Sequence, residues 1–352
     1  MILFIFFFIL LYWYLMKNEG DNDIIKYNNV IVFLFFLIIG LRNEAIYNDT
    51  YGYVYNFREI QDMSISQIMD RWPKDTFFYI LSRILHPFLL HNYTLWLLLI
   101  GAVYIFPLGL IVRKYSVNPM YSWTCFIFLG LMMFVMAGLR QAVALGLVSI
   151  AFLNLMNNKR VYFFFYVALA YLFHGTSLIF LILYPLRNIP FTVKAFIIYL
   201  LSFILLLVMG STVLSSVISL VGENDNRYLA YGENLQGSTF TYLLQQALLI
   251  LPSLYILKEK WHEPHVSLFF HAGMIGLLLV SLSPVIAEMF RLSMYFSWAN
   301  MILFPLAMKE ISTRESPLPF IYILFFILYL VVINQTVLQK YYFWFEDIGQ
   351  II

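Results

Sequence analysis

Long apolar runs constrain this sequence more than any other feature. The segment LWLLLIGAVYIFPLGLIV, positions 95–112, contains no charged residue, and a helix needs about 17–25 mostly apolar residues to cross a bilayer. Several further runs approach that length, and 62% of the 352 residues are hydrophobic while 11% are charged. A soluble fold could not bury so much apolar surface, so the sequence predicts an all-α polytopic membrane protein.

Charged breaks divide the apolar runs into about 12 predicted spans. They lie near 2–16, 28–41, 94–112, 119–137, 141–156, 161–173, 175–186, 195–215, 239–257, 265–287, 292–308 and 318–338. The pair that meets at His174 is short for a full crossing. No repeat or linker interrupts the chain, which predicts one integral membrane domain over 1–352, with outer loops at 42–93 and 216–238.

Basic residues predict the orientation of these spans. Threading the chain through them places one group on a single side, namely Lys17, Lys26, Arg113, Lys114, Lys159, Arg160, Arg187, Lys194, Lys258, Lys260, Lys309 and Arg314. The positive-inside rule makes that side cytoplasmic. The two outer loops, the turns at 138–141 and His174, the segment 288–291 and both termini are then expected outside.

Two segments need separate interpretation. The stretch 77–90, FFYILSRILHPFLL, is apolar but short and carries Arg83, His86 and Pro87, so we expect an amphipathic helix in the outer interface. The opening MILFIFFFILLYWYLM has neither a basic start nor a small-residue cleavage site, so we expect a retained first span.

The sequence lacks the residues that several classes of protein function require. The balance of 21 Lys and Arg against 19 Asp and Glu offers no basic surface for nucleic acid. The single Cys125 excludes an intrachain disulfide and a cysteine-rich metal site. The sequence contains no GxxxxGK[ST], HExxH or GxSxG motif and no histidines at metal-ligand spacing, so we expect neither ATP hydrolysis nor a metal.

The site candidates are polar residues that the predicted topology places on the outer side. For substrate binding they are Arg42, Tyr53, Arg140, Gln141, Arg227, Tyr228 and Arg291. A guanidinium binds phosphate oxygens bidentately and stays charged, so several of them suit an anionic ligand such as pyrophosphate. Snorkelling of single arginines to lipid headgroups is the alternative.

The candidates for proton transfer are Asp49, His174 and Glu288. A histidine bonded inside the bundle and structural ion pairs with Arg42 or Arg291 are the competing interpretations. Alternating rings at Tyr47, Tyr51, Tyr53, Tyr55 and Phe57 suit sugar recognition, although an interfacial aromatic belt explains them equally well. We expect seven further outer carboxylates in solvated loops, namely Glu44, Asp62, Asp70, Asp75, Glu223, Asp225 and Glu233.

Three motifs resemble the EpsG family of bacterial membrane proteins, which belongs with the Wzy-type polymerases. LRNEAIYNDTYGYVYNF is similar to its first-loop signature through Arg42, Asp49, Thr50, Tyr53 and Phe57, although it lacks a glycine common before the Asp. The second motif pairs Arg140-Gln141 with Phe173-His174. A third, weaker element is FRLSMYF, which carries Arg291.

The resemblance implies a metal-independent glycosyltransferase with a GT-C-like helical fold in the bacterial cytoplasmic membrane and no cofactor. It would transfer a growing glycan from undecaprenyl-pyrophosphate to the terminal sugar of a lipid-linked repeat unit on the outer, periplasmic face. Its partners would be that lipid-linked oligosaccharide, the bilayer, and a chain-length regulator and flippase of the same pathway. The alternatives are a lipid-linked oligosaccharide flippase or transporter, an O-antigen ligase and a membrane acyltransferase.

Overall fold

A computed structural model describes residues 2–16, 21–206, 227–283, 288–312 and 342–343. Within these residues the regular structure is helical, apart from one isolated antiparallel bridge between Arg42 and Phe343. Contacts divide the chain into two compact units. Unit 1 comprises Met1–Tyr115, Phe126–Leu178 and Phe320–Ile352, and unit 2 comprises Ser116–Cys125 and Ile179–Pro319. The single domain expected over 1–352 stays a prediction.

Apolar helices confirm that this is a membrane protein. Within the described residues, four helices are long and apolar enough to cross a bilayer: Asp23–Gly40, Tyr93–Tyr115, Leu139–Met156 and Pro264–Ser281. A fifth candidate is a pair of helices, Pro119–Phe128 and Leu131–Ala137, bent by 54°. Gly130, with a φ of 65°, allows that bend, because a left-handed backbone strains residues with a Cβ atom. The predicted span at 318–338 lies outside the described residues.

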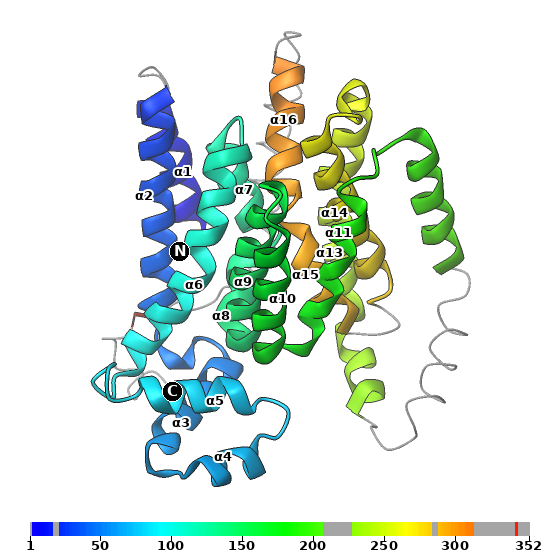
Figure 1. Ribbon diagram of the computed structural model, residues 1–352. Coiled ribbons are helices and arrows are strands. Elements are labelled where there is room, and N and C mark those ends of the chain that lie inside the picture. The colour runs from blue at the N-terminus through cyan, green and yellow to red at the C-terminus, as the bar shows by residue number, and fades with distance from the viewer. Residues whose placement is uncertain (1, 17–20, 207–226, 284–287, 313–341, 344–352) are drawn as a thin grey trace. The chain divides into compact units, whose positions relative to one another are not determined.

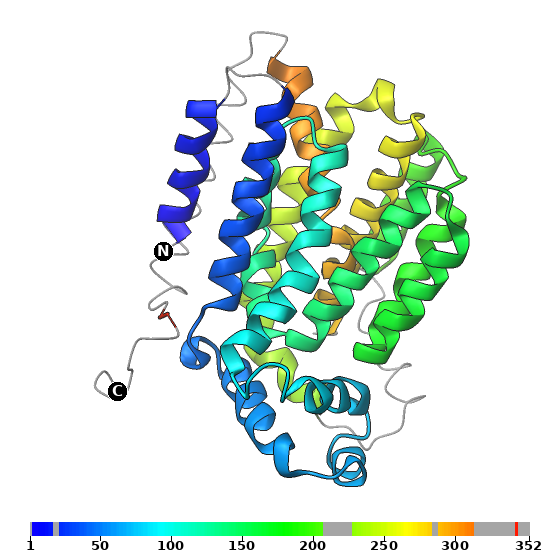
Figure 2. The ribbon, with the colours of Figure 1, turned by 60° about the vertical axis from the view of Figure 1, so that its left-hand side comes forward.

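Unit 1 contains a row of packed helices: α1 (Ile2–Met16), α2 (Asp21–Gly40), α6 (Tyr93–Tyr115), α9 (Leu139–Met156) and α10 (Arg160–Phe173). Each helix packs against the next in this order (Figures 1 and 2). Gly146 brings α9 directly onto α6, since a Cβ atom there would collide with the backbone carbonyl of Val103. Such small residues let membrane helices approach closely.

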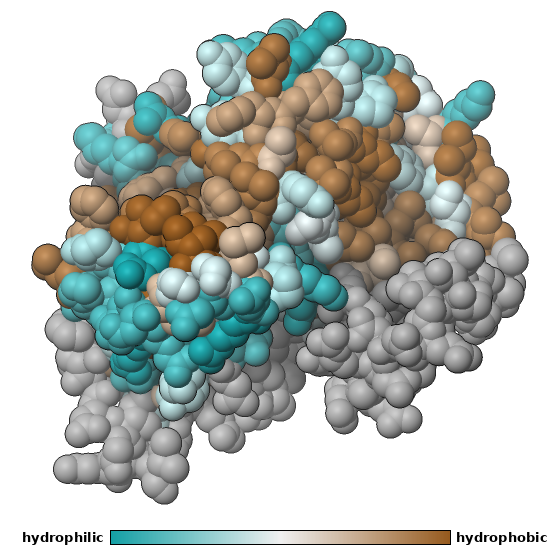
Figure 3. All heavy atoms as spheres, turned by 60° about the horizontal axis from the view of Figure 1, so that its bottom comes forward, coloured by the Kyte–Doolittle hydropathy of each residue, from teal (hydrophilic) through white to brown (hydrophobic). Residues whose placement is uncertain are grey.

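Short helices cover one end of that row in both ribbon views (Figures 1 and 2). They are η1 (Glu44–Ile46), α3 (Asn48–Glu59), η2 (Ile60–Asp62), α4 (Ile65–Arg71) and α5 (Thr76–Leu85). Phe57 of α3 stacks on His86 at 4.3 Å and on Trp96 of α6 at 4.6 Å between ring centroids. The Trp96 indole also donates to Ser82 at 3.2 Å, which fixes α5 to α6. The short helices from η1 to α5 are called the outer helices below, because they lie at the end of the row. In Figure 3 this end of unit 1 presents hydrophilic surface beside apolar surface.

The segment 77–90 is helical only in part, which corrects its predicted length. The helix α5 ends at Leu85, because Pro87 has no N–H to continue it. Leu90 and His91, with φ of 52° and 56°, then turn the chain into α6. Ten helical residues span about 15 Å, half of a bilayer core, so α5 does not cross.

Unit 2 contains η3 in part (Gly175–Ile182), α11 (Leu183–Leu186), an apolar helix at Val193–Leu206, α13 (Arg227–Ile256), η4 (Lys258–Lys260), α14 (Pro264–Ser281), α15 (Glu288–Ser297) and α16 (Asn300–Ser312). The helix α14 packs against α13, α15 and α16. Gln246 of α13 donates to the Ser297 hydroxyl of α15 at 2.7 Å, which links two of them through a buried hydrogen bond.

Two predicted elements of unit 2 are wrong in their boundaries. Residues 227–238 were expected in the loop 216–238 but belong to α13, because extending an existing helix needs only one residue fixed per new hydrogen bond. The part of that loop at 216–226 lies outside the described residues. The expected span at 292–308 is two helices, since the Ala299 N–H bonds to Phe296 only three residues back and ends α15.

Candidate functional site

Arg140 lies in the first turn of α9, at the end of unit 1 that α3–α5 cover. Gly138 separates α9 from α8 (Leu131–Ala137), with a backbone conformation outside the helical region. The first N–H groups of a helix have no partner within it and give that end partial positive charge. The guanidinium therefore adds a full positive charge where a helix already favours anions.

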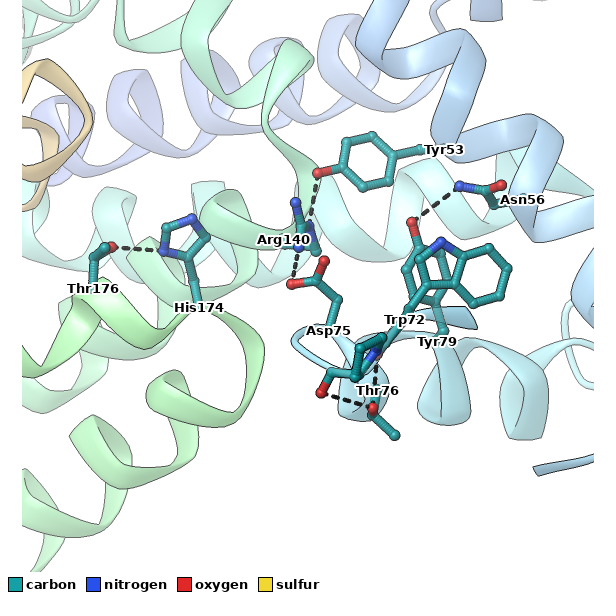
Figure 4. A network of polar contacts seen from close by, with 10 residues as sticks. Tyr53, Asn56, Trp72, Asp75, Thr76, Tyr79, Arg140, His174 and Thr176 are labelled. Atoms are coloured by element: carbon teal, nitrogen blue, oxygen red, sulfur yellow. Dashed lines mark hydrogen bonds and ion pairs between the residues drawn. The ribbon is translucent and has the colours of Figure 1, made fainter. Parts of the chain in front are cut away.

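Two side chains from the outer helices hold this guanidinium (Figure 4). Arg140 Nε donates to the hydroxyl of Tyr53 on α3 at 2.9 Å, and its Nη1 forms an ion pair with Oδ1 of Asp75. The side chains of Arg140 and Asp75 keep 26% and 27% of their exposure, so the pair lies at an accessible edge. Three segments far apart in sequence thus meet at one cation.

Asp75 is the N-cap residue of α5 but makes no capping hydrogen bond. An aspartate at this position ordinarily accepts from the first N–H groups of its helix. Here the carboxylate turns to Arg140 instead. It therefore has two alternative partners within reach: the cation, which it contacts, and the uncapped start of α5.

His174 is the C-cap of α10 and is partly buried. Its Nδ1 lies 2.6 Å from the Thr176 hydroxyl, a contact that fixes the plane of the ring. In Figure 4, His174 and Tyr53 lie on opposite sides of Arg140. The preceding ring, Phe173, contacts Phe77 of α5 with centroids 5.0 Å apart, so the end of α10 is held beside the start of α5.

The rings of the first outer segment fall on two faces, because the segment is a helix and not an extended chain. Tyr51 and Tyr55 are 54% and 47% exposed, whereas Tyr53 and Phe57 point inward. A further pair, Trp72 and Tyr79, stacks at 4.1 Å. Burial raises the pKa of Tyr79 to about 12, and its hydroxyl accepts a hydrogen bond from Asn56 at 3.1 Å.

A comparison with protein families identifies the group to which this chain is related. The EpsG family model matches residues 26–347, nearly the whole chain. The chain belongs to the EpsG family. This confirms the resemblance that the motifs indicated, to a family of Wzy-type polymerase-like proteins. Comparison with curated proteins and comparison with solved structures give no match.

In this EpsG family protein, Arg42 is buried and donates hydrogen bonds to backbone carbonyls near the site. Its side chain is 1% exposed and donates to the carbonyl of Ile39 and, at 2.8 Å, to that of Met136. The buried Thr50 hydroxyl donates to the same Met136 carbonyl at 2.8 Å. Carbonyls in the last turn of a helix need such outside donors. Arg42 and Thr50 thus fix the end of α8, and so the start of α9 that carries Arg140.

The other predicted residues of unit 1, Gln141 and Asp49, differ in their burial. Gln141 is 3% exposed and buried in the bundle. Asp49 is an exposed residue in the first turn of α3.

The remaining predicted residues belong to unit 2. Arg227 and Tyr228 begin α13, and Glu288 begins α15, while their side chains lie outside the described part of the structure. Arg291 is exposed on α15. Among the described residues of the EpsG family chain, no group of three or more His, Cys, Asp or Glu could hold a metal ion.

Asp75 is the residue that sequence reasoning missed. We expected it in a solvated loop, together with other carboxylates of the segment 42–93. A signal was present: an aspartate directly before an apolar run is typical of a helix start. That signal locates Asp75 at the beginning of α5, whereas the pairing with Arg140 depends on the packing of α5 beside α9.

Proposed function

We propose that this protein is a polysaccharide polymerase. It transfers a growing glycan from undecaprenyl-pyrophosphate to the terminal sugar of a lipid-linked repeat unit, as a metal-independent glycosyltransferase with about 12 spans and a GT-C-like fold. The observation that carries the proposal is Arg140, a partly exposed guanidinium at a helix start, held by Tyr53 and Asp75 in a chain of this family.

Arg140 binds the pyrophosphate of the donor. The negative charge on the bridging oxygen grows as the bond from sugar to phosphate breaks, and a fixed cation at a helix N-terminus stabilises that charge. The hydrogen bond to Tyr53 holds the guanidinium in place before substrate arrives. Arg42 acts on the same step indirectly, by positioning the end of α8.

Asp75 is the counter-ion that the pyrophosphate displaces. Its carboxylate occupies the Nη1 side of Arg140. Since α5 lacks a side-chain cap, the displaced carboxylate can accept from the α5 N–H groups. This exchange limits the energetic cost of displacing Asp75, because its carboxylate has a partner in both positions: Arg140 in one and the first N–H groups of α5 in the other.

His174 takes the proton of the acceptor. The acceptor hydroxyl oxygen forms a bond with the anomeric carbon, the bond from that carbon to the pyrophosphate oxygen breaks, and the hydroxyl proton passes to the imidazole. In the tautomer that this role requires, Nδ1–H donates to the Thr176 hydroxyl and Nε2 is the basic nitrogen. Asp49 and Glu288 are the alternative bases from the sequence, and Gln141, Arg227, Tyr228 and Arg291 the further substrate contacts.

Exposed rings of the outer helices suit the acceptor glycan. Tyr51 and Tyr55 share one face of α3, one helical turn apart. Their ring faces can pack against sugar C–H groups while neighbouring hydroxyls form hydrogen bonds. The acceptor end of the repeat unit would then extend over α3–α5.

The proposed setting is the bacterial cytoplasmic membrane, with α3–α5 on the outer side. The positive-inside pattern supports this orientation, because Arg113, Lys114, Lys159 and Arg160 lie at the ends of α6, α9 and α10 away from the outer helices. A flippase and a chain-length regulator of the same pathway are the proposed protein partners.

Reconstitution tests this function. Purified protein in proteoliposomes receives a lipid-linked repeat unit and no other protein, and products are separated by length. A ladder of glycans on the lipid supports the proposal. Movement of the repeat unit across the bilayer without a ladder would identify a flippase, and transfer of a glycan or acyl group to another acceptor would identify a ligase or acyltransferase.

A further inference from the structure

An apolar pocket lies beside the Arg140 ion pair in unit 1. Its volume is about 240 Å³, and helices α5, α6, α9 and α10 form its walls. Its lining includes Phe77, Leu99, Val103, Val143, Leu147 and Phe173. The one hydroxyl in the lining, that of Ser82, donates to the Phe78 carbonyl and accepts from Trp96. The pocket therefore offers no hydrogen bond to a ligand and suits a hydrocarbon.

Residues that line the pocket lie next to those of the polar site. Val143 and Leu147 follow Arg140 by three and seven residues, so all three share one face of α9, and the two lie about 4.5 and 10 Å along the axis. Phe77 follows Asp75 by two residues. Phe78, also in the lining, contacts the Tyr53 ring with centroids 5.9 Å apart.

One wall opens to the outside of the unit. Leu99 on the spanning helix α6 is 37% exposed, and Leu95, one turn earlier, is 36% exposed. Because α6 crosses the bilayer, exposed leucines on it face hydrocarbon chains. A lipid chain can thus reach the pocket from the side, while its head group meets Arg140.

We infer that this pocket binds the first isoprenoid units of the lipid whose diphosphate Arg140 holds. The inference rests on the proposed function, because it takes a lipid diphosphate as the ligand. A volume of about 240 Å³ is below the roughly 300–1,000 Å³ of pockets that enclose a drug-sized ligand, so only the beginning of the chain is held. The remainder stays in the bilayer.

The pocket acts by positioning. Lipid tails are as apolar as leucine, so leaving the bilayer gives the chain little hydrophobic gain. Fixing the first units instead limits where the diphosphate and the attached sugar can lie, which favours the reacting geometry. The sugar would then meet the acceptor at the end of α10, where His174 lies.

Leu99→Trp tests the inference, because an indole at this position fills the pocket from its open side. Leu110→Trp is the matched control, since Leu110 is a 51% exposed leucine on the same helix and does not line the pocket. Full-length proteins in phosphatidylcholine nanodiscs are titrated with geranylgeranyl diphosphate, with inorganic pyrophosphate and with geranylgeraniol.

Leu99→Trp should weaken geranylgeranyl diphosphate binding about tenfold or more, the scale of misfit in an apolar pocket. Pyrophosphate affinity should stay unchanged, which also verifies that the variant folds, and Leu110→Trp should alter neither. Leu169→Trp, on α10, fills the pocket from another wall and should give the same result. Unchanged lipid diphosphate binding in both pocket variants overturns the inference. Equal competition by added phosphatidylglycerol also overturns it, because the pocket would then hold bulk lipid.

These binding measurements need no acceptor and no polymer. If no ladder forms in reconstitution while Leu99→Trp selectively loses lipid diphosphate binding, the pocket inference is supported and the polymerase proposal fails. If a ladder forms while both pocket variants bind normally, the pocket inference alone fails.

Discussion

Arg140 and Asp75 form an ion pair that joins the first turn of α9 to the N-cap of α5. The two residues lie 65 positions apart in the sequence (140 minus 75). The Asp75 carboxylate covers one side of the Arg140 guanidinium. It also fixes α5 over the apolar pocket that α9 helps to line.

Replacing Arg140 by lysine should reduce polymer formation about 10²–10³-fold, the cost of losing a donor to the developing charge. Lysine keeps the positive charge but cannot present two parallel N–H donors to phosphate. The ladder assay measures the effect. Arg160→Lys is the control, an exposed arginine at the opposite end of α10. Long chains at normal rates from Arg140→Lys would show that the two parallel N–H donors of the guanidinium are dispensable.

Asp75→Asn should tighten pyrophosphate binding about two- to fivefold, since a partly exposed ion pair contributes roughly 0–1 kcal/mol. The neutral amide no longer competes for Arg140. Calorimetric titration with inorganic pyrophosphate gives the affinity, and Asp70→Asn, an exposed residue on α4, controls for the change in surface charge. Weaker binding in Asp75→Asn would mean that the carboxylate orients Arg140 for the ligand.

Thr50→Val should lower the stability of the protein by about 1–2 kcal/mol, because the buried Met136 carbonyl loses one of its two outside donors. The measurement is the thermal midpoint in detergent, with an expected drop of about 2–4 °C per kcal/mol. Thr124→Val is the control, since that buried hydroxyl bonds only to the carbonyl four residues earlier in its own helix. Equal shifts in both variants would argue against a clamp on α8.

Acid should loosen the outer helices through His86. This ring is 1% exposed, and its Nδ1 lies 2.6 Å from that of His91. Burial, and then the nearby His91, lowers the pKa of His86 below its ordinary value, so the folded state favours the neutral ring. The stabilisation is therefore complete above the unfolded pKa of about 6.5 and is lost as pH falls through it toward the lower folded pKa.

Hydrogen exchange of residues 76–92 at pH 7.5 and 5.5, corrected for intrinsic rates, measures this loosening. His91→Asn should reduce the pH response, because it removes the neighbouring imidazole that helps to lower the pKa of His86. Asparagine tolerates the left-handed backbone at this position. Equal protection at both pH values in the unmodified protein would show that His86 does not couple to folding of the outer helices.

Cysteine labelling tests the orientation. In a Cys125→Ala background, Lys74→Cys beside α5 should react with an impermeant thiol reagent added outside intact cells. Lys159→Cys, at the opposite end of α9 and α10, should react only after the membrane is opened. Both positions are exposed, so reactivity reports the side of the membrane. The reverse result would place Arg140 in the cytoplasm.

The apolar runs were sufficient to predict the class and most helices. A stretch such as 94–112 can satisfy its backbone inside a bilayer only as a helix, so α6 appears within a few residues of its predicted bounds. The bend at Gly130 and the end of α15 at Ser297 were not predictable, because local backbone geometry, not hydropathy, decides them.

The sequence by itself determined that this is a helical membrane protein of the EpsG type whose Arg140 begins a span, because hydropathy and motif spacing are local properties of the chain. Only the tertiary structure decided what surrounds that cation. Arg42 shares its outer loop with Asp75 and resembles Arg140 in sequence context, yet it is buried against carbonyls, while Asp75 pairs with Arg140. Those outcomes depend on how α3 and α5 pack on α8 and α9. Contacts between segments that are distant in the chain cannot be predicted from the residues next to either arginine.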